Sequence, residues 1–296
     1  MGEQAVGARA NQFAPGLGPK LASPDAIHIE EFGVLAVYDL PPLPCGLDAA
    51  ALLSCIEAAR HQILTVYEKA DLMLEYKADR SPLTLADRQS HTVLNQGLQR
   101  LLPGVPVLSE EGTVKDWQVR RHWSLLWLVD PLDGTRDFVQ RTGDFTINVA
   151  LVEGHAPILG LLDIPLQNTT YLGIRGQGAY RIGEEEAKPI HTRHRGDSHG
   201  LTAAISRSHQ ANEIAWLRTN GFDVGDVIPA GSALKFALIA EGRADLYPRL
   251  GPTMEWDTAA GQCLVEAAGG TVTQLDGAAL MYNRENLTNP PFLTRG

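Results

Sequence analysis

The segment LLWLVDPLDGTRDF, residues 125–138, joins a run of five apolar residues to a turn rich in aspartate. The apolar run predicts a buried strand whose last residue is Asp130. Pro131 follows and should end this strand, because proline has no N–H to donate to a sheet. Polar side chains with a chemical role in this segment are therefore expected at the tip of the strand.

The turn itself carries two carboxylates three residues apart, Asp130 and Asp133, which can face one point in space. Carboxylates are hard oxygen ligands that suit Mg²⁺ or Mn²⁺ better than zinc, and the Leu132 carbonyl between them can add a further oxygen. Gly134 and Thr135 are expected to open a helix, whose first N–H groups can hold a phosphate. The alternative is a turn in which the two aspartates only cap backbone groups.

Apolar strands and amphipathic helices interleave along the rest of the chain, without the regular βαβ alternation of a dinucleotide-binding fold. Strands are predicted at 105–108, 125–129, 146–152, 158–162, 169–174, 178–182, 244–247 and 271–274. Helices are predicted after the N-cap Asp48 and over 85–102, 211–219, 233–241 and 258–268. This order predicts a layered mixed α/β protein.

Composition narrows the class of protein. The chain has 296 residues, of which 44% are apolar and 20% charged, so it can bury a sizeable core and is not wholly disordered. No apolar run approaches the roughly 18 residues of a membrane span, and no integral membrane segment is expected. The net charge of −10 disfavours nucleic acid as a partner. Three scattered cysteines, Cys45, Cys55 and Cys263, predict no disulfide framework and no zinc site, and indicate a reducing compartment.

The first 45 residues are rich in Ala, Gly and Pro without a clear period, which predicts a loosely ordered extension, residues 1–45. They show neither the basic start nor the apolar stretch of a secretory signal. One domain is expected over residues 46–296. The histidine-rich run HTRHRGDSH at 191–199 lacks regular spacing, which favours a solvated loop over a zinc site.

Further acidic residues stand where elements are predicted to begin or end. Glu110 and Glu111 follow a short apolar strand, and adjacent glutamates at a strand tip are costly unless a cation compensates them. Asp257 stands at the start of an apolar helix, and Asp87 lies in the first turn of another. Both have a structural alternative, since Asp257 can be a helix N-cap and Asp87 can interact with the helix dipole.

Six strings in the chain form a specific set. They are KADRSPLTLAD (77–87), VLSEE (107–111), VDPLDGTRDF (129–138), ISRSH (205–209), GSALKFALIAEGRADLYPR (231–249) and GPTMEWDTAAG (251–261). In this order they resemble the magnesium-dependent, lithium-sensitive phosphatases of the inositol monophosphatase family, from about Asp48 to about Phe292. Within that family they look most similar to the CysQ-type 3′(2′),5′-bisphosphate nucleotidases.

The resemblance implies an α/β (α+β) fold, a layered αβαβα sandwich like that of fructose-1,6-bisphosphatase. It implies a metal-binding half at 46–185 and a substrate half at 186–296. It also implies two Mg²⁺ ions. The first would be held by Glu110, Asp130 and the Leu132 carbonyl, and the second by Asp130, Asp133 and Asp257.

The resemblance also implies catalytic roles. Asp87 and Thr135 would orient and deprotonate the attacking water, which two metals already activate. Asp79 and Glu111 would reach a third, weaker metal or support the other ligands. Because phosphoryl transfer depends mostly on positioning and charge stabilisation, Asp130, implied to contact both ions, should be the costliest residue to remove.

Substrate contacts are expected where hydroxyls, glycine turns and cations precede helices or follow strands. An arginine there can hold a phosphate bidentately, and a glycine turn can cradle an anion. Each feature also has a structural alternative, such as a capped helix start or a surface ion pair. By resemblance, the residues around the substrate are Gly134, Thr135, Ser206, Arg207, His209, Gly231, Ser232, Lys235 and Arg249.

The implied activity is hydrolysis of the 3′-phosphate of adenosine 3′,5′-bisphosphate to AMP and phosphate in sulfur metabolism, with a related activity on 3′-phosphoadenylyl sulfate. One alternative is an inositol monophosphatase or sugar-bisphosphate phosphatase. Another is a metal-dependent nucleotide-binding regulator without activity. The implied protein is a cytoplasmic monomer or homodimer with a small-molecule nucleotide substrate, and peripheral association with the inner membrane stays open.

Overall fold

The computed structural model describes residues 38–69, 72, 74–77, 82–193, 199–207 and 210–296. The helices are η2 (Pro44–Gly46), α1 (Ala49–Tyr67), α2 (Leu85–Leu101), α3 (Trp117–Arg120), α4 (Thr135–Val139), η3 (Pro165–Gln167), α5 (Gln210–Thr219), α6 (Leu234–Ala240) and α7 (Glu255–Ala267). The strands are β1 (Glu75–Tyr76), β2 (Pro82–Leu83), β3 (Val107–Ser109), β4 (Leu125–Asp133), β5 (Thr146–Glu153), β6 (Ala156–Ile164), β7 (Thr169–Ile174), β8 (Gly178–Ile182), β9 (Ala187–Ile190), β10 (Leu201–Ile205), β11 (Val224–Pro229), β12 (Leu246–Arg249), β13 (Thr253–Met254), β14 (Thr271–Gln274), β15 (Thr288–Asn289) and β16 (Phe292–Arg295).

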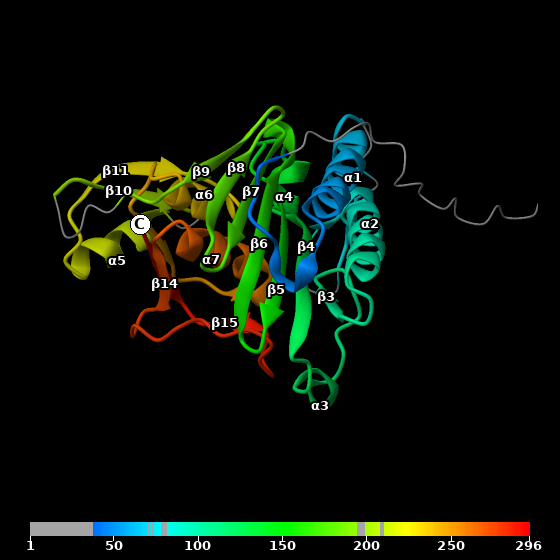
Figure 1. The fold of residues 1–296 in the computed structure, drawn as a ribbon. Helices are drawn as coiled ribbons and strands as arrows, with labels where there is room; N and C mark the ends of the chain where they lie inside the picture. The colour runs from blue at the N-terminus through cyan, green and yellow to red at the C-terminus, as the bar shows by residue number, and fades with distance from the viewer. Residues whose placement is uncertain (1–37, 70–71, 73, 78–81, 194–198, 208–209) are drawn as a thin grey trace, which may run out of the picture.

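These elements stack in five layers (Figure 1). Helices α1 and α2 cover the outer face of a seven-stranded sheet, while α6 and α7 lie between that sheet and a five-stranded one. Helix α5 covers the remaining face of the five-stranded sheet. A buried apolar cluster fills each of the main interfaces between layers. The predicted αβαβα sandwich is therefore confirmed.

The two sheets differ in their strand directions. The seven-stranded sheet has the order β3-β4-β5-β6-β7-β8-β9 and is antiparallel except where β3 and β4 pair in parallel. Its strand β5 is buried over every residue but the last, as expected for a strand with helices on both faces. The five-stranded sheet has the order β11-β10-β12-β16-β14, with parallel pairs on one side and antiparallel pairs on the other.

Helix α7 packs closely against the seven-stranded sheet at two glycines. A Cβ on Gly160 would lie 2.4 Å from the Ala260 carbonyl oxygen, and one on Gly173 would lie 2.5 Å from the Leu264 Cα. No side chain fits at either point, so the backbone of the helix rests directly on the strands. This packing fixes the helix whose first turn carries Asp257.

The predicted end of the strand at Asp130 is wrong. Strand β4 continues to Asp133, with a register shift against β5, in which Asp130 pairs with Asn148 and Asp133 with Thr146. Three steps along β4 thus match two along β5, which is the signature of a bulge. A bulge leaves a residue outside the hydrogen-bond ladder, and this accommodates Pro131 within the strand.

The predicted start of the last helix is also wrong. Helix α7 begins at Glu255 rather than at 258, so Asp257 lies in its first turn and is not the N-cap. The Asp257 side chain accepts the backbone N–H of Met254 at 2.8 Å. It therefore satisfies a donor at the helix start from within the first turn, which allows the helix to begin earlier.

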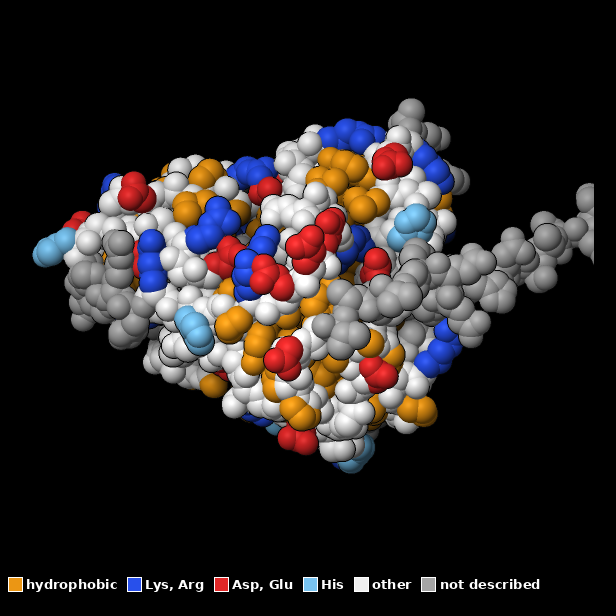
Figure 2. Space-filling model, turned by 45° about the horizontal axis from the view of Figure 1, so that its top comes forward, with side chains coloured by type: hydrophobic (Ala, Val, Ile, Leu, Met, Phe, Trp, Pro, Cys, Tyr) orange, Lys and Arg blue, Asp and Glu red, His pale blue; other side chains and the backbone are white. Residues whose placement is uncertain are grey.

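Part of the predicted extension, residues 1–37, lies outside the described residues. In the remainder, Tyr38 donates to the Gly183 carbonyl at 2.9 Å and Leu43 is buried against the domain. None of the helices in the described ranges combines the length and apolar character that a membrane crossing requires. Figure 2 shows acidic and basic side chains interspersed over one face of the molecule.

Candidate active site

Three carboxylates from distant parts of the chain converge at the end of β4. One oxygen atom from each of Glu110, Asp130 and Asp257 lies within 4.8 Å of the other two. Glu110 follows β3, the parallel neighbour of β4, and Asp257 arrives on α7 from the second half of the chain. The bulged end of β4 supplies Asp130. The structure thus brings Asp257 next to two residues that precede it by more than a hundred positions in the sequence.

Asp133 stands beside this group and makes different contacts. Its Oδ2 accepts from the Ser232 hydroxyl at 2.6 Å and from the Asn148 side-chain amide at 3.4 Å. Asp130, by contrast, accepts the backbone N–H of Leu132 at 3.0 Å. These bonds hold both aspartates at the bulge, and Asp133 also joins the bulge to the turn before α6.

The cluster concentrates negative charge where water cannot solvate it. Asp130 is only 2% exposed, and burial, together with Glu110, Asp133 and Asp257, raises its pKa well above the ordinary value. Burial and the charge of Asp133 raise the pKa of Asp257 in the same way. Buried like charges need a compensating cation, and every donor here is a hard oxygen. The donor set therefore fits a divalent metal ion.

Glu110 and Glu111 share a cationic partner that the sequence analysis missed. The Lys77 Nζ lies 2.7 Å from Glu110 Oε1 and 2.5 Å from Glu111 Oε1. Burial disfavours the charged form of Lys77, but its bonds to the two carboxylates outweigh burial and raise its pKa. In this structure a lysine ammonium supplies the compensation expected for adjacent glutamates.

Asp87 and Thr135 meet next to the bulge of β4. The Thr135 hydroxyl lies 3.2 Å from Asp87 Oδ1 and 3.2 Å from the Leu132 carbonyl oxygen. The other carboxylate oxygen of Asp87 accepts from the Thr84 backbone N–H at 2.7 Å and from its hydroxyl at 2.6 Å. Burial raises the pKa of Asp87 to about 6, although these hydrogen bonds lower it. One oxygen of Asp87 thus caps α2, and the other faces Thr135.

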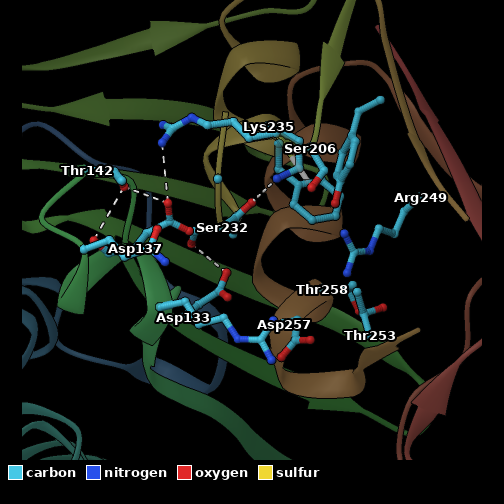
Figure 3. A pocket seen from close by; sticks show the side chains of 17 residues that line it. Asp133, Asp137, Thr142, Ser206, Ser232, Lys235, Arg249, Thr253, Asp257 and Thr258 are labelled. Carbon is cyan, nitrogen blue, oxygen red and sulfur yellow. Dashed lines mark hydrogen bonds and ion pairs between the residues drawn. The ribbon is translucent and has the colours of Figure 1, made fainter. Parts of the chain in front are cut away.

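A cavity of about 470 Å³ opens beside the carboxylates (Figure 3). Asp133 and Asp257 form part of its wall. Asp137 and Thr142 lie on the opposite side of the cavity from Arg249. The predicted substrate residues that line it are Ser206, Arg207, Gly231, Ser232, Lys235 and Arg249.

Three cations in the cavity wall, Arg136, Lys235 and Arg249, have no carboxylate within ion-pair distance in the described part of the chain. Lys235 is 3% exposed and donates to the Ala230 carbonyl at 3.2 Å and the Ser232 carbonyl at 2.5 Å. Burial lowers its pKa to about 8. Arg249 donates to the Pro252 carbonyl at 3.2 Å, and its buried Nε lacks a hydrogen-bond partner among the described residues.

The predicted glycines of the substrate site lie close to Asp144, and two other predicted site residues are not described. Gly134 precedes α4 with a φ of 88°, and a Cβ there would lie 2.7 Å from the Asp144 carbonyl oxygen. The Gly231 N–H donates to the Asp144 carboxylate at 2.6 Å. Asp79 and His209 lie outside the described residues.

The comparisons with known proteins assign this chain to a family. Residues 48–294 match the sequence profile of the inositol monophosphatase family. The chain belongs to the inositol monophosphatase family. The chain is 45% identical, over 233 residues, to the Escherichia coli (strain K12) protein named 3′(2′),5′-bisphosphate nucleotidase CysQ, covering 78% of this chain and 92% of that one.

Solved structures of the inositol monophosphatase family match the fold. The crystal structure of CysQ from Bacteroides thetaiotaomicron superposes with a TM-score of 0.72 at 38% identity, covering 83% of this chain and 96% of that one. The Thermotoga maritima IMPase matches with a TM-score of 0.68 at 23% identity, covering 82% and 89%, which is a likeness of fold alone. The resemblance drawn from the six strings is confirmed at the level of the family.

In this inositol monophosphatase family member, two structural partners of the site, Lys77 and Asp144, could not be recognised from the sequence. Lys77 lies within one of the six strings, but a lysine in a loop gives no signal of its partner until the topology is known. Asp144 follows a glycine in the loop after α4, where an aspartate is an ordinary turn residue. Its contacts reach residues some 60 to 90 positions away.

Proposed function

We propose that this protein hydrolyses the 3′-phosphate of adenosine 3′,5′-bisphosphate, giving AMP and phosphate, with Mg²⁺ as its cofactor. The observation that carries the proposal is one cavity whose wall contains both acidic Asp133 and Asp257 and cationic Lys235 and Arg249. A substrate with two phosphates needs both features, because one phosphate is transferred and the other is only held. The 45% identity to a bisphosphate nucleotidase supports the choice of a nucleotide.

Two Mg²⁺ ions would be held by oxygen ligands at the end of β4. The proposed ligands are Glu110, Asp130 and the Leu132 carbonyl for one ion, and Asp130, Asp133 and Asp257 for the other, with Asp79 and Glu111 near a third. Bound Mg²⁺ neutralises charge on a phosphoryl group and lowers the pKa of a coordinated water. The protein's own contribution is to hold these carboxylates together before any ion arrives.

Asp87 and Thr135 act on the proton of the attacking water. With a pKa of about 6, Asp87 is ionised at neutral pH and can accept a hydrogen bond from the Thr135 hydroxyl at Oδ1. The lone pairs of Thr135 Oγ1 are then directed toward the site, where they can accept a hydrogen bond from water. Thr84 keeps the Asp87 carboxylate in this orientation through its two bonds to Oδ2.

Lys235 and Arg249 hold the phosphate that is not transferred. Their positive charge is not compensated by an ion pair in the described part of the chain, so an anion in the cavity would gain charge-assisted hydrogen bonds from both. Ser206 and Ser232 line the same cavity and offer hydroxyl groups to the ribose. The same arrangement suits 3′-phosphoadenylyl sulfate, whose sulfate group extends the 5′-phosphate.

The test is phosphate release with Mg²⁺ from adenosine 3′,5′-bisphosphate, inositol 1-phosphate and fructose 1,6-bisphosphate, each with and without Li⁺. We expect a strong preference for the nucleotide and inhibition by Li⁺. A preference for inositol 1-phosphate would instead support an inositol monophosphatase. Nucleotide binding with no phosphate release under Mg²⁺ would support a regulator.

A matched pair of variants tests the acidic cluster within the same assay. Asp130→Asn removes one charge from the centre of the cluster, and turnover should fall on the order of 10³-fold or more while the protein stays folded. Asp276→Asn, which changes an exposed aspartate far along the chain, should leave turnover unchanged. Near-native turnover in Asp130→Asn would refute the assignment of this residue.

A further inference from the structure

The guanidinium of Arg207 is neutralised on one side of the cavity. Its Nη1 lies 3.4 Å from Asp137 Oδ1, and its Nη2 contacts Asp144 Oδ2. Both carboxylates belong to the metal-binding half, whereas Arg207 belongs to the substrate half. The Arg207 side chain is still 40% exposed and lines the cavity. The Arg207 side chain is therefore accessible to a ligand in the cavity, in addition to linking the two halves through its ion pairs.

The charge around Arg207 is wrong for a phosphate. One positive charge faces two negative ones, so the three side chains together carry a net charge of about −1. A phosphate placed there would be repelled by two carboxylates while it was attracted by one guanidinium. Lys235 and Arg249 lack such partners in the described part of the chain, and Arg249 lies across the cavity from Asp137 (Figure 3). The cavity wall thus contains three cations without a carboxylate partner in the described part of the chain, Arg136, Lys235 and Arg249, and a neutralised side at Arg207.

The neutralised side is built to hold Arg207 in one orientation. Asp144 Oδ2 also accepts the Gly231 N–H at 2.6 Å, and a Cβ on Gly231 would lie 2.8 Å from the Asp144 Cβ. Asp137 Oδ1 accepts from the Thr142 hydroxyl at 2.6 Å. Both carboxylates are therefore fixed by other bonds. They contact the terminal nitrogens of the guanidinium, which leaves its planar faces for other contacts.

We propose that Arg207, oriented by Asp137 and Asp144, is the surface on which the base of the nucleotide stacks. A planar guanidinium stacks on aromatic rings, and neutralising its charge removes its attraction for phosphate while keeping its flat face. None of the cation–aromatic contacts found within the described residues involves Arg207. Arg207 is thus the residue that selects a nucleotide over a sugar phosphate. This inference rests on the proposed function.

The test compares two substrates in the full-length protein with Mg²⁺. One is adenosine 3′,5′-bisphosphate, and the other is 1-deoxyribose 3,5-bisphosphate, which keeps both phosphates and lacks the base. The measured quantity is the ratio of kcat/KM for the first substrate to kcat/KM for the second. In Arg207→Lys, which keeps the charge but loses the planar group, this ratio should fall about tenfold, the effect of losing one stacked base. Arg207→Met should lower it by a similar factor.

Other roles for Arg207 give different results. If Arg207 bound a phosphate, Arg207→Lys would largely preserve kcat/KM for both substrates. Arg207→Met would then lower kcat/KM for both substrates and leave their ratio unchanged. A purely structural bond between the halves would also lower both values equally in both variants. Either result overturns the inference. If the wild-type protein releases no phosphate from the nucleotide, the proposed function fails and this inference fails with it, whereas an unchanged ratio in an active enzyme defeats this inference alone.

Discussion

At Thr135 one hydroxyl proton has two acceptors, since Asp87 Oδ1 and the Leu132 carbonyl oxygen are each 3.2 Å away. A hydroxyl can donate only once, so the ionisation of Asp87 decides where the proton points. An ionised Asp87 draws the proton toward itself because a charged acceptor makes the stronger hydrogen bond. In the proposed mechanism, the orientation of the attacking water is therefore coupled to the charge of a residue that also caps α2.

This coupling predicts the behaviour of two variants at Thr135. Thr135→Val keeps the shape of the side chain but removes the hydroxyl, and kcat should fall about 10²-fold, a typical effect of losing a group in proton transfer. Thr135→Ser keeps the hydroxyl and should stay within a few-fold of wild type. Steady-state kinetics at saturating Mg²⁺ measures both. Equal losses in the two variants would show that the methyl group matters and the hydroxyl does not.

Lys235 predicts a pH dependence of substrate binding. Burial, followed by the charge of Arg249, lowers the pKa of Lys235 to about 8, so the side chain loses its proton above that pH in the free enzyme. An anionic substrate needs the charged form, and KM for adenosine 3′,5′-bisphosphate should therefore rise as the pH increases from 8 to 9.5. Lys235→Arg stays charged throughout and should show no such rise.

The stability change associated with Lys235 has the opposite sign. The unfolded chain keeps the ordinary lysine pKa of 10.5, so above pH 8 it holds a proton that the folded protein has lost. The contribution of Lys235 to the free energy of unfolding therefore increases between pH 8 and about 10.5. If KM of the wild-type protein stayed constant between pH 8 and 9.5, Lys235 would not be a contact of the substrate.

At the scale of elements, the position of α7 is set by glycines in the neighbouring strands. Gly173→Ala would place a methyl group 2.5 Å from the Leu264 Cα, and a helix backbone cannot move aside as a side chain can. The free energy of unfolding should fall by about 1–3 kcal/mol, the usual cost of overpacking. Because α7 carries Asp257, the affinity for Mg²⁺ should fall as well. Denaturant unfolding and a metal titration measure the two effects.

A second glycine provides the control for this prediction. Gly183 also lies in the region of the seven-stranded sheet, but a Cβ there would meet nothing within 4 Å, and its φ is not positive. Gly183→Ala should leave both the unfolding midpoint and the Mg²⁺ affinity unchanged. If both alanine variants behaved alike, the close approach of α7 to Gly173 would not matter for stability.

The longer helices and most strands of the seven-stranded sheet were predictable from the sequence. Strands β10, β11 and β16 of the five-stranded sheet were not predicted, and the ends of several elements were wrong. The apolar run before Asp130 and the periodic pattern of α2 gave the correct kind of structure because burial and periodicity are local properties. Pro131 was expected to end β4, yet the bulge accommodates it. Whether a proline ends a strand or sits in a bulge depends on the partner strand, which the local sequence does not specify.

Single residues of the candidate site could also be predicted from the sequence, whereas their partners in space could not. Asp87, Glu110 and Asp257 could be named from their strings because each stands at the beginning or end of an element, and Asp130 because it follows an apolar run, although it lies at the bulge within β4. Lys77 could not be paired with Glu110 and Glu111, nor Asp144 with Arg207, since both pairings depend on the packing of separate segments. Charge partners across a fold are set by topology and not by sequence spacing.

At the scale of the whole molecule, the acidic cluster joins the two halves of the chain. Glu110 and Asp130 come from the first part of the chain, before residue 186, and Asp257 comes from the part after it. An ion bound by all three bridges the halves, while the metal-free protein must hold these buried like charges together. Metal binding should therefore stabilise the whole fold and not only a local loop.

Adding Mg²⁺ to protein stripped with EDTA should raise the free energy of unfolding by about 2.7 kcal/mol at a concentration a hundredfold above Kd, because the ion binds only the folded state. Asp257→Asn removes the only carboxylate of the three-residue cluster that lies after residue 186, and most of this gain should disappear. The same variant also relieves repulsion, so without metal it should be at least as stable as wild type. Thermal unfolding of both proteins with EDTA and with Mg²⁺ measures all four states. An equal gain from Mg²⁺ in the two proteins would mean that the ion is held by one half alone.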